Sequence, residues 1–238
     1  MGPEMANDRS PALDHLGPEV LPPNGATRPQ ARRLLETAVV AFAERGYHGV
    51  SVRDITAAVG IKAGSFYSHF PSKEQLLFEL MLLGHESHQA YVRDALLSAN
   101  PDPAHQLREA IRANVFFQGT YPLLTVVANT ELHALSGANR ARVLNIRHES
   151  GVLVAAVIER GNDIGVFECE RPWLALSAIA AMGVRLAWWF RQDLSSDATQ
   201  LGTYPAEAIT WLPDGSLTLD EISAEYAEYA LKIVGYAP

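Results

Sequence analysis

The chain has 238 residues, of which 48% are hydrophobic, so it can bury a sizeable core as one large domain or two smaller ones. No apolar run approaches the roughly 20 residues of a membrane-spanning helix, and the N-terminus lacks the charged and apolar segments of a signal peptide. The single cysteine, Cys169, excludes an internal disulfide framework and a multi-cysteine zinc site. We therefore expect a cytoplasmic protein without a membrane partner.

The net charge of −8 argues against nucleic acid as a partner, but the charge is unevenly distributed along the chain. The segment from Arg28 to Leu83 holds seven arginines and lysines against five acidic residues, so this segment is net positive and the remainder is acidic. Such a distribution is compatible with a DNA-facing module attached to an acidic body.

Residues 1–27 contain five prolines and no apolar periodicity, a composition that predicts a disordered arm. From Arg28 onwards, apolar residues recur at steps of three and four. This spacing predicts an amphipathic helix with Pro29 in its first turn and Gly46 as its stop signal.

Two short helices are expected next. Ser51 is followed three positions later by Asp54, which resembles a capping box, and Gly60 ends a helix of only about two turns. A second short helix begins near Ala63, and Ser72 then caps a long apolar helix that runs into the nineties. Two short helices joined by a glycine-containing turn have the spacing of a helix-turn-helix.

Beyond residue 100 the pattern is again helical. Apolar periodicity and Pro or Gly boundaries predict further helices over 103–117, 121–135, 138–160, 171–191 and 218–234, with a polar irregular stretch over 195–215. No convincing alternating pattern of strands is present. The fold class is therefore expected to be all-α.

The stretch "GSFYSHF" combines apolar and polar aromatic residues within one short helix. Phe66 and Phe70 are four residues apart and share the face that we expect to be buried. Ser65, Tyr67 and His69 lie off this face and would project outward together. Small residues at the start of a helix allow its backbone to approach a phosphate, although a packed helical hairpin with incidental surface polar groups remains open at this point.

The block "LLETAVVAFAERGYHGVSVRDITAAVGIKAGSFYSHFPSKEQLL" closely resembles the DNA-binding domain of the tetracycline-repressor (TetR) family of transcriptional regulators. The resemblance runs from about Ala31 to Leu83. It implies a helix-turn-helix DNA-binding domain over residues 28–75. It also implies a DNA-facing set made of Ser51, Arg53, Lys62, Ala63, Gly64, Ser65, Tyr67, His69 and Lys73. Within it, Arg53 could read a guanine edge, whereas Tyr67 and Lys73 would contact phosphates.

The family further implies a homodimer that binds double-stranded operator DNA, and a helical ligand-binding and dimerisation domain over 76–238. The segments "PWLALSAIAAMGVRLAWWFRQD" and "SLTLDEISAEYAEYALKIV" resemble the last two helices of a branch that responds to acyl-CoA thioesters. The stretch over 195–215 is longer than this branch leads us to expect. We expect the dimer interface on the helices at 171–191 and 218–234.

The effector pocket is expected between the helices from about 103 to 191. Its candidate lining comprises Phe116, Phe117, Tyr121, Leu124, Val127, Asn129, His133, Arg147, Arg185 and Trp188. Arg147 and Arg185 are candidates for binding the phosphates of CoA, although arginines in apolar helices are commonly paired structural residues. His85 and His88 lie three apart, and we interpret them as solvated or hinge-side residues rather than a metal site.

These observations predict a ligand-responsive repressor that a small apolar effector, such as an acyl-CoA thioester, releases from its operator. A regulator of an efflux system that responds to a drug-like compound is the alternative. A helical enzyme is a third hypothesis, but GxSxG, Walker-type and GxGxxG motifs are all missing from the sequence. Glu131 and His133 alone complete no catalytic constellation, and neither a cofactor nor a metal is expected.

Overall fold

A computed structural model describes residues 20–23, 28–190 and 217–237 of the chain. These residues form α-helices and a short 3-10 helix, without a strand in the described ranges, so the expected all-α class is confirmed. The helices are α1 (Pro29–Arg45), α2 (Val52–Val59), α3 (Ala63–Phe66), α4 (Lys73–Ser98), α5 (Pro103–Thr120), α6 (Pro122–Thr130), η2 (Leu132–Ala134), α7 (Gly137–Asp163), α8 (Pro172–Leu186) and α9 (Leu219–Ile233). None of these helices is both long and apolar enough to cross a membrane.

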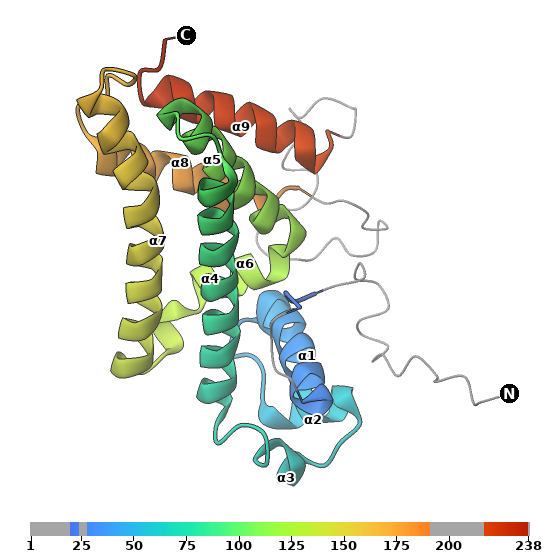
Figure 1. The fold of residues 1–238 in the computed structure, drawn as a ribbon. Helices are drawn as coiled ribbons and strands as arrows, with labels where there is room; N and C mark the ends of the chain where they lie inside the picture. Colours follow the sequence, from blue (N-terminus) through green and yellow to red (C-terminus); the bar gives the residue numbers. More distant parts are fainter. Residues whose placement is uncertain (1–19, 24–27, 191–216, 238) are drawn as a thin grey trace, which may run out of the picture.

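The helices are arranged along an elongated molecule. Figure 1 shows α1, α2 and α3 gathered at one end, and α5, α8 and α9 at the opposite end. The two longest helices, α4 and α7, pack against each other and run along the length between the ends. The short α6 lies between the two ends, where it packs on both α1 and α4.

The local sequence explains where the N-terminal helices begin and end. The hydroxyl of Ser51 accepts a hydrogen bond from the backbone N–H of Asp54, and the Asp54 carboxylate accepts one from the backbone N–H of Ser51, which completes the expected capping box. Gly60 ends α2 with a φ of 78°, a left-handed conformation that glycine adopts without strain. Ser72 caps α4 by accepting from the backbone N–H of Gln75.

Two groups of buried side chains hold the helices together. The N-terminal core joins α1, α2, α3 and the first half of α4 to α6, and includes Phe42, Ile55, Phe66, Leu77 and Val127. The C-terminal core joins α5 and the second half of α7 to α8 and α9. Full burial of each large apolar side chain contributes about 1.5–3 kcal/mol. Because α6 belongs to the N-terminal core, the helix-turn-helix end is packed directly against a helix that follows it in the chain.

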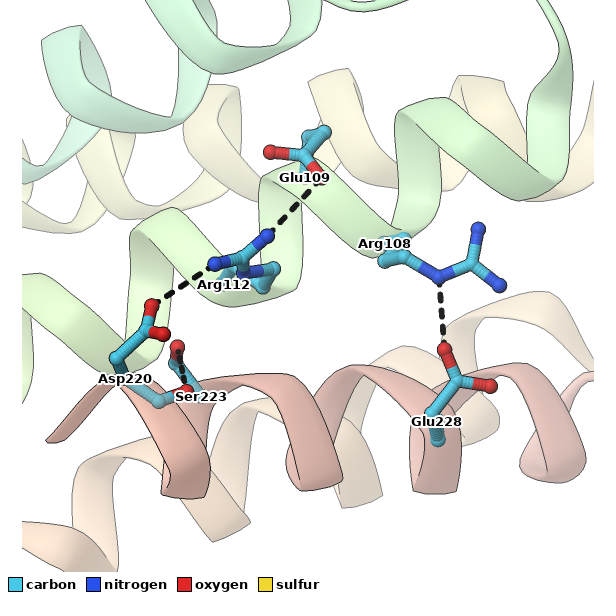
Figure 2. Close-up of polar contacts among 6 residues, drawn as sticks. All are labelled: Arg108, Glu109, Arg112, Asp220, Ser223 and Glu228. Carbon is cyan, nitrogen blue, oxygen red and sulfur yellow. Dashed lines mark hydrogen bonds and ion pairs between the residues drawn. The ribbon is translucent and has the colours of Figure 1, made fainter. Parts of the chain in front are cut away.

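The α5–α9 contact combines surface ion pairs with close packing. Figure 2 shows Arg108 of α5 paired with Glu228 of α9 at 2.7 Å, and Arg112 paired with Asp220 at 2.9 Å. Pairs as exposed as these contribute at most about 1 kcal/mol each. Beneath them, a Cβ added to Gly119 would collide with Leu219, so the two helices approach more closely than a larger residue would allow.

Three details differ from the sequence-based expectation. The helix expected over 121–135 ends at Thr130 and is continued only by the 3-10 turn η2, and α8 ends at Leu186 rather than at residue 191. Part of the expected disordered arm is packed: Leu21 is buried, and the Arg32 guanidinium donates hydrogen bonds to the Leu21 and Pro22 carbonyls at 2.8 and 2.6 Å. The rest of the arm and the stretch over 195–215 lie outside the described residues.

Candidate DNA-contacting face and effector cavity

The short helix α3 is anchored by its aromatic side chains, as the sequence predicts. Phe66 and Phe70 are 0% and 5% exposed, and their ring centroids lie 5.8 Å apart. Tyr67 packs its ring edge-on against Phe66 but remains 59% exposed. The two phenylalanines therefore fix α3 in place, while the Tyr67 hydroxyl end is available to a partner.

Gly64 occupies a position where its own chain does not require glycine. A Cβ built there meets no atom of the described structure within 4 Å, and φ is not in the left-handed region. Gly46 and Gly60, in contrast, both have positive φ. The missing side chain at Gly64 therefore leaves room for something outside the chain to approach the backbone of α3.

The remaining members of the expected DNA-facing set lie on or directly beside α2 and α3, and at the start of α4. Arg53, Lys62, Ser65 and the Ser51 cap are exposed, whereas Ala63 and His69 are half-buried. The Nδ1 atom of His69 is buried without a hydrogen-bond partner in the described structure, so only part of this ring is available to a ligand.

Lys73 differs from the rest of the set because its ammonium group is engaged within the protein. Its Nζ donates to the carbonyls of Tyr47 and Val50 at 2.8 and 2.7 Å, and it lies 4.0 Å from the centre of the Tyr47 ring. Partial burial lowers the pKa of Lys73 from its ordinary value, an effect that the charge of Asp54 opposes. This side chain thus ties the start of α4 to the α1–α2 connection.

A cavity of about 210 Å³ lies in the other half of the molecule. Its wall comes from five helices and is mostly apolar. Leucine, isoleucine, valine and phenylalanine from α4 to α8 supply the apolar surface. The polar side chains of the wall are His85, His88, Asn114, Gln118, Thr125, Asn129, Arg147 and Ser150.

The structure places four of the expected pocket residues on this wall: Phe117, Leu124, Asn129 and Arg147. The other six lie elsewhere in the described structure. Tyr121 and Val127 are buried in the N-terminal core, and Phe116 is 45% exposed on the surface of α5. His133 is exposed in η2, where its Nδ1 lies 2.9 Å from the Thr130 carbonyl.

The last two expected pocket residues lie together at the end of α8. The Arg185 guanidinium stacks over the Trp188 ring at 5.6 Å, with Arg185 itself exposed. Neither residue belongs to the cavity wall. The adjacent Trp189 instead packs against the C-terminal core and meets Phe190 edge-on.

The interpretation of His85 and His88 as solvated or hinge-side residues is wrong, because both line the cavity. His88 Nε2 lies 2.8 Å from Asn114 Oδ1, which also accepts a 3.4 Å hydrogen bond from Gln118. Thr125 donates to Gln118 Oε1 at 2.6 Å and completes a chain of polar side chains that crosses from α4 through α5 to α6. A Cβ added to Gly183 would collide with the Asn114 amide, so the absence of a side chain at Gly183 provides the space that the Asn114 side chain occupies.

Both histidines are neutral near pH 7. Burial lowers the pKa of His85 from its ordinary value of 6.5 to about 3; the positive charge of Arg147 acts in the same direction, as does His88 when it is protonated. Burial is also the main cause of the lowered pKa of His88, which its contact with Asn114 partly offsets. The cavity therefore presents imidazole rings rather than imidazolium ions.

Among the described residues, Arg147 is the only cation on the cavity wall, and it lies on α7. Part of its surface is exposed, but burial on the cavity side lowers the pKa of its guanidinium from the ordinary value. Within the described ranges it makes no hydrogen bond or ion pair that would neutralise it. No aspartate or glutamate from the described part of the chain lies on the wall. An anionic group near the cavity would therefore meet an uncompensated guanidinium.

Two sequence profiles cover most of the region described above. Residues 34–80 match the bacterial regulatory proteins of the tetR family, and residues 100–210 match the tetracyclin repressor-like C-terminal domain. The chain belongs to the tetR family. This membership confirms the expected DNA-binding transcriptional regulator with a helix-turn-helix, and confirms that the protein is not an enzyme.

Relatives in the tetR family include named transcriptional repressors. The chain is 27% identical over 183 residues to the repressor KstR2 of Mycobacterium tuberculosis, a match that covers 75% of this chain and 90% of KstR2. It is 32% identical over 121 residues to the repressor DhaR of Mycobacterium sp. strain GP1, covering 51% of this chain and 61% of DhaR. The molecule is thus a transcriptional repressor of the tetR family.

Solved structures of the tetR family share the fold. A regulator from Rhodococcus RHA1 is 27% identical with a TM-score of 0.74, over 89% of this chain and 100% of that one. AibR, solved in complex with isovaleryl coenzyme A and operator DNA, is 22% identical with a TM-score of 0.69, over 87% of this chain and 100% of that one. The likeness to AibR concerns the fold alone.

Proposed function

We propose that this repressor binds operator DNA as a homodimer through α2 and α3, and that an acyl-CoA thioester in the cavity releases it. The observation that carries the effector class is the pairing of a mostly apolar cavity with a single uncompensated guanidinium, that of Arg147. An acyl chain would fill the apolar part, and an anionic phosphate would be attracted to Arg147.

The size of the cavity determines which part of such a ligand it can enclose. About 210 Å³ accommodates an acyl group but not the whole of coenzyme A, so the nucleotide part would remain outside. AibR, which shares this fold, was solved in complex with isovaleryl coenzyme A, and this precedent supports the same ligand class. A cationic drug, the alternative effector, is disfavoured because no carboxylate lies on the described wall to neutralise it.

Helix α6 offers a route from the cavity to the DNA-contacting end. Leu124 and Ala128 of α6 line the cavity, whereas Leu123 and Val127 of the same helix are buried in the core shared with α1. A ligand that shifts α6 would therefore displace packed neighbours of α1. Release then follows if the ligand binds more tightly to the arrangement that does not fit DNA.

The dimer is proposed to form through α8 and α9. Trp173 and Leu174 of α8 and Tyr229 and Ile233 of α9 are each more than 40% exposed, which leaves apolar surface on both helices. Two copies would supply two α3 helices for two half-sites about one helical turn apart. Sedimentation of a monomer at micromolar concentration would contradict this assembly.

The effector class is tested on a preformed complex of the full chain with operator DNA. Medium- and long-chain acyl-CoAs are titrated in, with the corresponding free acids in parallel, and fluorescence anisotropy of the labelled DNA reports release. Thioesters should release the DNA at much lower concentration than the acids, because only thioesters carry phosphates for Arg147. Release by the acids at equal concentration would contradict the proposal.

A matched pair of variants tests the role of Arg147. Arg147→Ala should lose the thioester response and keep DNA binding. Arg140→Ala removes the same charge from an exposed position of the same helix that is not part of the cavity wall, and should respond like the wild type. An equal loss of the thioester response in both variants would show that Arg147 acts only through nonspecific electrostatics.

A further inference from the structure

One atom on the cavity wall has a hydrogen-bonding capacity that an unsubstituted acyl chain does not satisfy. The Nε2 atom of His85 is buried and has no hydrogen-bond partner in the described structure. Buried polar groups in native proteins are nearly always paired, so an unpaired one on a cavity wall indicates a partner that enters from outside the chain.

The other side of the ring determines what kind of partner this is. His85 hydrogen-bonds to the backbone of Ala128 in α6, and because this bond raises the pKa of the ring, the group that His85 meets is the Ala128 carbonyl. Since Nε2 is unpaired, the bond uses Nδ1. A carbonyl only accepts, so Nδ1 carries the proton. In a neutral imidazole the second nitrogen is then an acceptor. Nε2 therefore offers a lone pair, and its missing partner is a hydrogen-bond donor.

Five other polar residues of the wall, His88, Asn114, Gln118, Thr125 and Asn129, are already hydrogen-bonded within the protein. Asn114 Oδ1 is shared by His88 and Gln118, and the Thr125 hydroxyl donates to Gln118. The Asn129 amide donates to the Thr125 carbonyl at 2.8 Å. This network does not include His85, so His85 Nε2 remains available to a ligand, as do Arg147 and Ser150.

We propose that the cavity encloses the uncharged part of a ligand, made of an apolar body and a hydroxyl group, and that this hydroxyl donates a hydrogen bond to His85 Nε2. A carboxylate would place acceptor oxygens against the lone pair, and an ammonium group would find no anion on the described wall. Under the proposed function, on which this inference builds, the effector is then an acyl thioester whose acyl group carries a hydroxyl.

The inference can be tested without a thioester, by comparing two probes of one carbon skeleton. Menthol carries a hydroxyl donor, and menthone has a carbonyl that can only accept. Binding of each to the full chain is measured by calorimetry. Menthol should bind about tenfold more tightly than menthone. Equal affinities, or no binding of menthol, would overturn the inference.

Two substitutions of His85 distinguish the loss of its hydrogen-bond acceptor from a general effect on the fold. His85→Asn can keep a donor for the Ala128 carbonyl but removes the acceptor at the Nε2 position, so the preference for menthol should fall to within about twofold. His85→Gln places an amide oxygen near that position and should restore part of the preference. An unchanged preference in His85→Asn would show that the hydroxyl binds elsewhere.

Histidine-selective ¹⁵N NMR provides a direct readout on the ring. In the free protein, His85 should show a protonated Nδ1 and an unprotonated Nε2, and menthol should shift the Nε2 resonance in the direction of a hydrogen-bonded acceptor. A protonated Nε2 in the free protein would contradict the inference. Because none of these measurements involves DNA or CoA, their failure would leave the acyl-CoA test above unaffected, and failure of that test would leave these intact.

Discussion

Gly64→Ala separates the requirements of the fold from those of DNA binding. The added Cβ meets no atom of the described structure within 4 Å, and the backbone does not need glycine's conformational freedom there. Alanine is favoured over glycine in helices, so the free energy of unfolding should rise by up to about 1 kcal/mol. If α3 lies against DNA at Gly64, the same methyl group should weaken a backbone contact by about 1.5 kcal/mol per half-site. For a dimer this amounts to about 3 kcal/mol, or on the order of 100-fold in affinity.

Two measurements on the same preparation test this reasoning: urea denaturation for stability and anisotropy of labelled operator DNA for affinity. Gly137→Ala is the matched control, because a Cβ at Gly137 also meets nothing within 4 Å, φ is not left-handed, and the residue opens α7 and is not a member of the DNA-facing set. The control should keep wild-type affinity. Unchanged affinity in Gly64→Ala, or an equal loss in Gly137→Ala, would refute the assignment of α3 as the DNA-contacting helix.

Three further outcomes are expected. Lys73→Met should lower the free energy of unfolding by about 1–3 kcal/mol in urea denaturation, because it leaves two backbone carbonyls without their charged donor. A loss of DNA affinity without any loss of stability would instead indicate that Lys73 contacts a phosphate. Lowering the pH from about 7.5 to about 5 should reduce the free energy of unfolding by on the order of 2 kcal/mol. Over this range His85 takes up a proton in the unfolded chain but not in the folded protein, where its pKa is about 3. His85→Asn should therefore weaken the dependence of stability on pH. Gly119→Ala should destabilise the protein more than Arg112→Ala, since the first creates a collision with α9 and the second removes an exposed ion pair; the reverse order in thermal denaturation would contradict the described packing.

The sequence predicted the helix-turn-helix end closely because its signals are local. The capping box at Ser51, the left-handed Gly60 and the Phe66–Phe70 pair each depend on residues within four positions of one another. Lys73 is the exception at this end. Its partners lie 23 and 26 residues earlier in the chain, and spacing along one helix carries no information about such contacts.

The cavity was predicted less well because its wall comes from five separate helices. Aromatic content suggested Tyr121 and Trp188, which lie in the core and at the end of α8, respectively. His85 and His88 were misinterpreted because a polar residue in an apolar helix has the same spacing whether it faces water or a cavity. The available signal was the pattern of α4, where both histidines follow a run of buried residues that ends at Gly84.

The central claim is that α2 and α3 hold operator DNA and that the cavity controls this contact. It is tested most directly by hydrogen–deuterium exchange of the full chain with an operator selected from a random DNA pool. DNA should slow exchange mainly within residues 51–73, and an effector that releases DNA should reverse this and slow exchange in α6 instead. Protection by DNA centred on α8 and α9, with residues 51–73 unaffected, would contradict the account.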